Sequence, residues 1–233
     1  MAAEAERRPA FYALRPGGWR DLVTLLHPPY TLWHISYVAI GAAAAPQIHA
    51  GRLGAALAAF FLAVGIGAHS LDELHGRPLG TRLSRQALLT LAAVGLGGAL
   101  AIGVAGTFVV SATLAPLVVA GGFMVVAYNL ELFGGRFHTA FWFAAAWGAF
   151  PALTGWWSNA LALHSAGQAI AASAAVLACF WLSAAQRRLS TPVREARRER
   201  STTAGTEPLE RALRLLVWAS VLIAVALVAA RLR

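Results

Sequence analysis

The segment that decides the fold is residues 53–69, LGAALAAFFLAVGIGAH, together with residues 70–81, SLDELHGRPLGT, which follow directly. The first part is long and apolar enough to cross a bilayer as a helix, since a transmembrane helix needs about 20 residues and at least about 17. Two histidines, two carboxylates and an arginine gather where it ends: His69, His75, Asp72, Glu73 and Arg77. Ionisable groups at the edge of a membrane are costly to hold, so they mark a candidate functional site.

The composition extends the membrane interpretation to the whole chain. Of its 233 residues, 58% are hydrophobic and 12% are charged, whereas a soluble domain carries about 25% charged residues. Apolar runs near spanning length recur along the sequence. We expect an all-α polytopic transmembrane bundle of about seven spans, at residues 29–45, 53–69, 86–104, 108–132, 139–157, 161–185 and 209–230.

The distribution of arginine predicts the orientation. All 19 basic residues are arginine, and the formal net charge is +9. They concentrate before the first span, in the loops around residues 77 and 136, and after residue 186, so that only Arg52, Arg231 and Arg233 fall on the other side. The positive-inside rule places the larger group in the cytoplasm. We therefore expect an integral membrane protein with its N-terminus in the cytoplasm, its C-terminus outside, and no nucleic-acid partner.

We divide the chain into a leader and one transmembrane domain. Residues 1–28 form an arginine-rich cytoplasmic leader without a signal-peptide core, which can lie along the membrane surface or stay a disordered tail. Residues 29–233 form a single helical domain with a polar cytoplasmic loop at 187–208. That segment is either a solvated loop or short surface helix near anionic headgroups, or it binds a diphosphate. The one cysteine, Cys179, excludes a disulfide within the chain.

The polar residues at the end of the second span form the first candidate site. His69, Asp72 and Glu73 share one face of a helix, and His75 lies close to it. Asp72 and Glu73 can bind a hard divalent cation while Arg77 holds a phosphate. Alternatively, His69 and His75 can bind zinc or iron together with a carboxylate. In the simplest alternative, the group is a polar helix end whose side chains hydrogen-bond to one another.

A second candidate site ends the fourth span. Residues 128–139, YNLELFGGRFHT, repeat the order Glu-Leu, Gly, Arg, Thr that residues 73–81 also follow. If the two loops face each other across one cavity, Glu73 and Glu131 supply acids, and Arg77 and Arg136 hold an anion. Farther along, Trp147 can line an isoprenoid channel or shield a carbocation by a cation–π contact, or simply pack in the core.

Over residues 30–157 the chain resembles the UbiA-type intramembrane prenyltransferase superfamily. The resemblance lies in the arginine-bearing leader, in Arg77-Pro78-Leu79 after an acidic span end, in the aromatic-polar turn Tyr128-Asn129, and in residues 147–151, WGAFP. The first family motif, Asn-Asp-x-x-Asp-x-x-x-Asp, falls on Ala68, His69, Asp72 and Gly76 and matches at Asp72. The second aspartate motif has no counterpart in residues 190–197, and the family usually has nine spans.

The resemblance implies a divergent, shortened UbiA-like transferase. It would move a prenyl group from an isoprenoid diphosphate to an acceptor at a cytoplasmic site. Mg²⁺ would be held by Asp72 and Glu73 and completed by Glu131 or His138. The remaining roles are substrate binding by Arg77, Arg136, Tyr128, Asn129 and Trp147, and proton acceptance by His69 and His75.

Two other functions remain open at this point. One is a membrane metalloenzyme with His69, Asp72, His75 and His138 around zinc or iron. The other is a non-catalytic membrane subunit that binds a lipid or a quinone. All three interpretations involve membrane lipid, and the sequence leaves the oligomeric state open.

Overall fold

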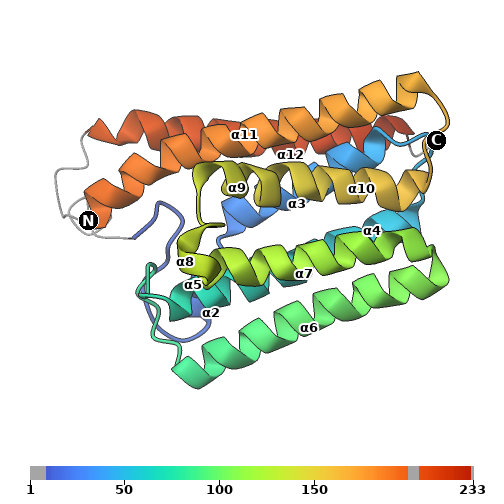
Figure 1. Cartoon of the computed structure of the whole chain (residues 1–233). Helices are drawn as coiled ribbons and strands as arrows, with labels where there is room; N and C mark the ends of the chain where they lie inside the picture. The colour runs from blue at the N-terminus through green and yellow to red at the C-terminus, as the bar shows by residue number, and fades with distance from the viewer. Residues whose placement is uncertain (1–8, 199–204, 232–233) are drawn as a thin grey trace.

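The computed structural model describes residues 9–198 and 205–231, and within these ranges it is helical and contains no strand (Figure 1). The N-terminal third contains α2 (Trp19–Leu25), α3 (Pro28–Ala43), α4 (Ala50–Phe60), η1 (Phe61–Ala68) and α5 (His69–Leu74). The middle contains α6 (Arg85–Val109), η2 (Ala112–Leu114), α7 (Ala115–Asn129) and α8 (Leu132–Gly135). The remainder contains α9 (Ala140–Ala144), η3 (Ala145–Ala149), α10 (Phe150–Ala160), α11 (Ala166–Arg198) and α12 (Glu207–Arg231). The parts of the expected leader and loop at residues 1–8 and 199–204 lie outside the described residues.

Five helical segments are long and apolar enough to cross a membrane: Ala50–Leu74, Arg85–Val109, Ala112–Asn129, Ala166–Arg197 and Glu207–Arg231. Only 17–39% of their most apolar stretches is buried inside the protein. Their outward side chains are large and hydrophobic, as at Phe108, Val109, Ile170 and Leu215. Apolar surface on this scale needs a lipid environment, so the prediction of an all-α integral membrane protein is confirmed.

Helix α3 lies at the centre and packs against α10 and α12. Its contact with α10 depends on glycine on both sides. A Cβ atom on Gly155 would stand 2.0 Å from the carbonyl oxygen of Val38, and one on Gly41 would stand 1.9 Å from that of Ala152. Small residues that let two backbones touch are the usual means of packing helices in membranes. Glycine therefore sets the spacing at the core of the bundle.

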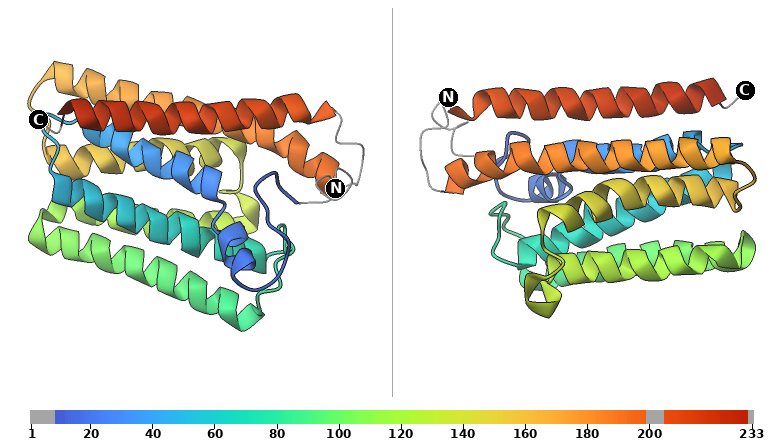
Figure 2. Two further views of the ribbon diagram at one scale, coloured as in Figure 1. Left: turned by 180° about the vertical axis from the view of Figure 1, so that it is seen from behind. Right: turned by 45° about the horizontal axis from the view of Figure 1, so that its top comes forward.

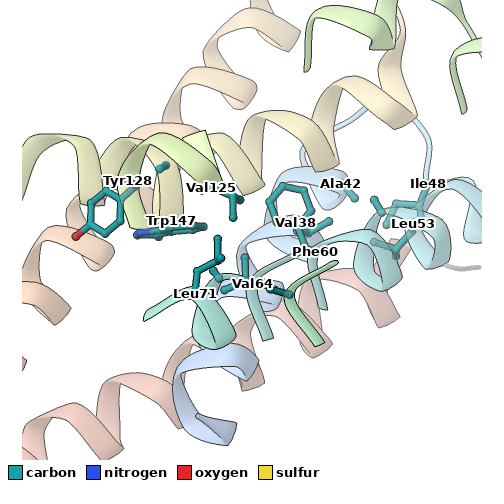
Figure 3. Close-up of a cluster of buried hydrophobic side chains, with 14 residues drawn as sticks. Val38, Ala42, Ile48, Leu53, Phe60, Val64, Leu71, Val125, Tyr128 and Trp147 are labelled. Carbon is teal, nitrogen blue, oxygen red and sulfur yellow. The ribbon is translucent and has the colours of Figure 1, made fainter. Parts of the chain in front are cut away.

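The hydrophobic core follows the long axis of the bundle. Figure 3 shows Tyr128 and Trp147 on one side, Val125 and Phe60 in the middle, and Leu53 on the other side. We call the end nearest α2, α5 and α8 the polar end, and the opposite end the far end (Figure 1). The two ends differ in chemistry, because most ionisable side chains of the described residues lie at the polar end.

Helix α11 is longer than the sequence suggested. The expected span ended near residue 185, followed by a polar loop from 187 to 208, but the helix continues to Arg198 and includes Pro192. Arginine, alanine and glutamate favour helix, and arginine stems can cover apolar surface while their heads stay in water. The side chain of Arg197 then reaches Glu210 on α12, with Nε and Oε1 3.1 Å apart. The two helices are thus tied together at the polar end.

The described part of the leader packs on the polar end (Figure 2). Asp21 is almost completely buried, and its carboxylate accepts hydrogen bonds from the backbone N–H groups of Gly17 and Arg82, at 2.9 and 3.0 Å. Thr24 accepts another from the N–H of Leu14 at 2.9 Å. Residues 9–27 therefore form a cover for the bundle, held to the loop that follows α5.

Candidate functional site

The loop after α5 is organised by Glu73. This carboxylate is 0% exposed and accepts three hydrogen bonds of 2.8–2.9 Å, from the N–H groups of Leu79 and Thr81 and from the Thr81 hydroxyl. Arg77 closes the same loop, because its Nη1 donates to the carbonyl oxygens of Thr81 and Leu83, at 3.0 and 2.7 Å. Both side chains are thus engaged in holding the loop. The metal and phosphate roles predicted for them stay predictions.

The neighbouring carboxylate, Asp72, is in the opposite situation. It is half-buried, and within the described chain nothing donates a hydrogen bond to it and no cation pairs with it. The ionisable groups in electrostatic range are Arg194, Glu73, His138 and His75. A carboxylate held at a membrane edge without a partner is costly. It is therefore available to a ligand, as its place in the sequence suggested.

Two stacked histidines lie beside this carboxylate. The rings of His69 and His27 have their centroids 4.0 Å apart, and Nδ1 of His69 donates to the carbonyl oxygen of Gly65 at 3.3 Å. Gly65 belongs to the π-helical segment η1, and such segments often occur at functional sites. The carbonyl fixes the tautomer of His69, since a carbonyl oxygen can only accept.

The leader completes the histidine stack. The hydroxyl of Tyr12 lies 2.5 Å from Nδ1 of His27. Burial raises the pKa of Tyr12 well above 10.0, so the tyrosine keeps its proton and can donate it to this nitrogen. Burial is the main cause that holds the pKa of His27 well below 6.5, and the neighbouring His69 and the positive charge of Arg194 act in the same direction. The imidazole of His27 is therefore neutral, and its Nε2 is buried with no hydrogen-bond partner among the described residues.

Two arginines of α11 lie at the polar end of the bundle. The guanidinium of Arg187 donates to the hydroxyl of Tyr128 and stands 5.3 Å above the ring of Phe143. Arg194 is seven residues farther on, hence on the same face of the helix. It lies within electrostatic range of five groups: Tyr12, His27, Tyr30, Asp72 and Tyr128. Neither arginine forms an ion pair with a described residue.

We call Tyr12, His27, His69, Asp72, Tyr128, Arg187 and Arg194 the polar-end cluster. It unites three residues of the sequence prediction, His69, Asp72 and Tyr128, with four that were not chosen. A signal existed for the two arginines, because a helical interpretation of residues 187–198 would have put them on one face. No pattern in the sequence pointed to Tyr12 or His27, because their position depends on how the leader folds back.

Aromatic rings form the floor of the polar-end cluster. The ring of Tyr128 stacks on His138, with centroids 4.5 Å apart, and meets Trp147 edge-on at 5.6 Å. Nδ1 of His138 donates to the carbonyl oxygen of Tyr128 at 3.1 Å. Figure 3 shows the Tyr128 hydroxyl pointing away from the apolar core. Trp147 thus separates the polar end from the hydrophobic interior.

The other predicted residues lie at the margin of the site. Glu131 is exposed, has a left-handed backbone with φ of 49°, and approaches Nδ1 of His138 only to 3.9 Å. Asn129 donates to the carbonyl oxygen of Val125 in its own helix, at 2.7 Å. His75 and Arg136 are exposed. The loops at the ends of α5 and α7 lie at the same end of the bundle (Figure 1), and the pairing of their Glu and Arg residues across one cavity stays a prediction.

A buried polar pair below the cluster was not predicted. Nδ1 of His34 donates to the carbonyl oxygen of Trp147 at 2.7 Å, and the side-chain nitrogen of Gln186 lies 3.5 Å from Nε2 of His34. Trp147 belongs to the second π-helical segment, η3. Each π-helical segment therefore supplies a backbone carbonyl to a histidine, His69 in one case and His34 in the other.

The donor set limits how a metal can bind. Within residues 9–198 and 205–231, no three side chains of His, Cys, Asp or Glu come together as ligands. Both oxygens of Glu73 are already engaged by the loop, which leaves Asp72 as the free carboxylate of the cluster. Magnesium is often held by one or two carboxylates and completed by substrate phosphates and water. Asp72 fits that pattern.

No family model, curated protein or solved structure matches this chain. The site must therefore be interpreted from its own chemistry. Its features are two arginines and one carboxylate that form no ion pair with a described residue, a neutral His27, and aromatic rings at the end of an apolar bundle.

Proposed function

We propose that the polar-end cluster binds the diphosphate of an isoprenoid lipid, and that the protein is a shortened UbiA-like prenyltransferase. The observation that carries the proposal is the placement of Arg187 and Arg194 on one face of α11, both without an anionic partner among the described residues. Arg187 donates to the hydroxyl of Tyr128, and Arg194 lies within electrostatic range of Asp72 and Tyr128. The resemblance in the sequence supports the same class of function.

The cluster suits a diphosphate for electrostatic reasons. Guanidinium groups bind phosphate oxygens through paired, charge-assisted hydrogen bonds. The Tyr128 hydroxyl, already bonded to Arg187, and the buried His27 are further neutral groups at the same place. The apolar bundle beside them suits a hydrocarbon chain. The site thus combines a polar headgroup region with an apolar surrounding, as a lipid diphosphate requires.

In the proposed reaction, the bond between the allylic carbon and the diphosphate oxygen breaks, and its electron pair leaves with the diphosphate. Arg187 and Arg194 stabilise the negative charge of the departing group, which is where such a site gains most of its rate. The acceptor nucleophile then forms a bond to the allylic cation and loses a proton, which Asp72 or a neutral histidine such as His69 accepts. A magnesium ion on Asp72 and the diphosphate oxygens would further neutralise the leaving group.

The proposal includes a topology. Besides the five segments above, α3 and the run of α9, η3 and α10 lie lengthwise in the bundle (Figure 2). We propose that both also cross the membrane, which gives seven spans. α3 has 16 residues, about 24 Å at 1.5 Å per residue, and its deep burial lets neighbouring helices shield it from lipid. Arginine at the polar end then places this end and the N-terminus in the cytoplasm, with the C-terminus outside.

The test uses the full-length protein in lipid nanodiscs, with farnesyl diphosphate as the probe. We expect the probe to bind and diphosphate to be released when an acceptor is present, with release increasing on addition of Mg²⁺. Arg187→Gln should weaken binding at least about tenfold, the effect of losing a charge-assisted hydrogen bond. Arg188→Gln is the matched control, because its exposed side chain directly follows in the same helix. Equal binding by both variants would refute the assignment.

The same experiment separates the alternative functions. Binding without diphosphate release, across several acceptor classes, would indicate a non-catalytic lipid-binding subunit instead. Zinc or iron retained through purification and lost with Asp72→Asn would indicate a metalloenzyme.

A further inference from the structure

A second, apolar compartment occupies the other half of the bundle. It is a cavity of about 200 Å³ between α4, η1, α6, α7, η3 and α10. Almost all of its lining is hydrocarbon, from Trp147 and Val125 at the inner boundary past Phe60 (Figure 3) to Arg52, Thr154 and Ser158. The cavity therefore extends toward the far end, away from the polar-end cluster.

The cavity and the polar-end cluster are separate in this structure. None of the seven cluster residues lines the cavity. Trp147 forms the boundary, with the Tyr128 ring against its edge on the polar side and the cavity on the other. A ligand in the cavity would therefore place its polar group at the end of the cavity that lies away from Trp147. Arg52, the one charged residue among the described lining residues, lies at that end.

Arg52 is a cation without a partner. Within the described residues it forms no hydrogen bond and no ion pair, whereas Arg231, at the same end, donates to the carbonyl oxygens of Ala45 and Pro46 at 2.6 and 2.7 Å. Arg231 thus has a structural role that Arg52 lacks. Arg52 also lies in the first turn of α4, where the helix dipole disfavours a positive charge. An anion beside Arg52 would remove this cost.

A second polar group in the lining also lacks a partner. The hydroxyl of Thr154 is buried, lines the cavity and has no hydrogen bond to any described residue. Ser158, one turn farther along α10, already donates to the carbonyl oxygen of Gly155 at 3.1 Å. A buried hydroxyl without a partner is unfavourable, because it has lost its hydrogen bonds to water. A ligand with an acceptor oxygen inside the cavity would satisfy it.

From these contacts we infer that the cavity binds an anionic phospholipid of the leaflet at the far end. One acyl chain lies in the cavity, the phosphate lies on Arg52, and an ester carbonyl accepts from Thr154. The cavity is smaller than the roughly 300–1,000 Å³ of pockets for whole drug-sized ligands, so it holds part of one chain while the rest stays in the bilayer. This site is independent of the proposed prenyl transfer.

The experiment measures lipid bound to purified protein by native mass spectrometry, after exchange into detergent with phosphatidylglycerol, phosphatidylcholine or oleate. Wild type should retain phosphatidylglycerol about tenfold better than phosphatidylcholine. Arg52→Gln should lose that preference, and Arg52→Lys should keep it, because a charge-assisted contact is worth about 1.5–3 kcal/mol. Ala59→Trp, which fills the cavity, should reduce retention of phosphatidylglycerol, whereas Ala58→Trp, outside the lining, should not.

Three results would overturn the inference. The first is an unchanged lipid preference in Arg52→Gln. The second is better retention of oleate than of phosphatidylglycerol, which would assign the cavity to a free fatty acid. The third is loss of farnesyl diphosphate binding in Ala59→Trp, which would make the cavity the chain end of the polar-end site. Should Ala59→Trp fail to fold, Ala99→Leu on the facing wall tests the same point.

Discussion

Asp72 and Glu73 are adjacent in α5, yet their hydrogen bonding differs. Glu73 turns toward its own loop, where three donors satisfy it. Asp72 turns toward Arg194 and the histidines without any hydrogen bond to a described residue. The role of Glu73 in the fold is therefore tested by measuring stability, and the role of Asp72 in the site by measuring activity.

Asp72→Asn removes a charge while keeping the shape of the side chain. We expect diphosphate release to be lost while membrane insertion and thermal stability stay unchanged, because this carboxylate forms no hydrogen bond and no ion pair with a described residue. Diphosphate release by the purified variant, with its melting temperature as control, is the measurement. Turnover at the wild-type rate would remove Asp72 from the site.

Glu73→Gln should act on stability instead. The amide keeps one acceptor oxygen but brings an NH₂ group against the backbone N–H of Leu79 or of Thr81, which now donates to the second oxygen. A buried donor left unsatisfied costs about 1–3 kcal/mol. Unfolding in detergent, followed by circular dichroism, should show the loss. Glu195→Gln, at an exposed position of α11, is the control and should leave the melting temperature unchanged.

How far the sequence predicts these residues depends on the range of their contacts. Asp72 was found from its position at the end of an apolar run. The partners of Glu73 lie six and eight residues away, across a loop with left-handed backbone at Arg77 and Gly80, which no periodicity reveals. The stacking of His27 on His69 joins two parts of the chain that only the folded leader brings together.

At the scale of the helix, α3 and α10 show what the sequence predicts and what it does not. Glycine and alanine recur in the apolar spans, and small residues allow helices to pack closely. Which glycines touch the backbone of a neighbouring helix, as Gly155 and Gly41 do, depends on helix rotation, which the sequence leaves open. The π-helical segments could not be predicted from the sequence either. Their residues are ordinary helix formers, and only the backbone hydrogen-bond pattern distinguishes these segments from α-helix.

Gly155→Ala should force α3 and α10 apart, because its Cβ would lie 2.0 Å from the carbonyl oxygen of Val38. Overpacking of this kind typically costs about 1–3 kcal/mol, and contact with rigid backbone places the expected cost at the upper part of that range. Thermal unfolding of purified protein is the measurement. The matched control is Gly54→Ala in α4, where the added methyl meets nothing within 4 Å. Equal melting temperatures for the two variants would contradict the packing argument.

In the whole molecule, the leader covers the polar end and so controls access to the cluster from that side. Tyr12 and His27 belong both to this cover and to the site. Phe11 adds a cation–π contact, with the guanidinium of Arg214 4.6 Å from its ring. A ligand entering from the water must displace residues 9–27, or else enter sideways from the bilayer. The strength with which the leader docks therefore affects binding.

Docking of the leader should weaken in acid, and the direction follows from His27. When the leader is docked, burial keeps the pKa of His27 well below 6.5, and the neighbouring His69, the positive charge of Arg194 and the neighbouring His34 act in the same direction. When it is released, the histidine regains an ordinary pKa near 6.5. The released state then binds more protons below this pH, so docking is fully stable above about pH 6.5 and loses up to about 1.4 kcal/mol per pH unit below it.

Hydrogen exchange of residues 9–26, expressed as protection factors so that the intrinsic pH dependence of exchange cancels, measures this effect. Protection should fall progressively between pH 6.5 and 4.5 in the wild type. In His27→Gln, protection should change much less with pH, because glutamine does not titrate. Loss of the stacking on His69 should lower protection by the same factor at every pH. His164→Gln, exposed at the far end, should follow the wild type. If His27→Gln kept the full wild-type slope, another group would govern the leader, and the neutral histidine beneath Tyr12 would have only a packing role.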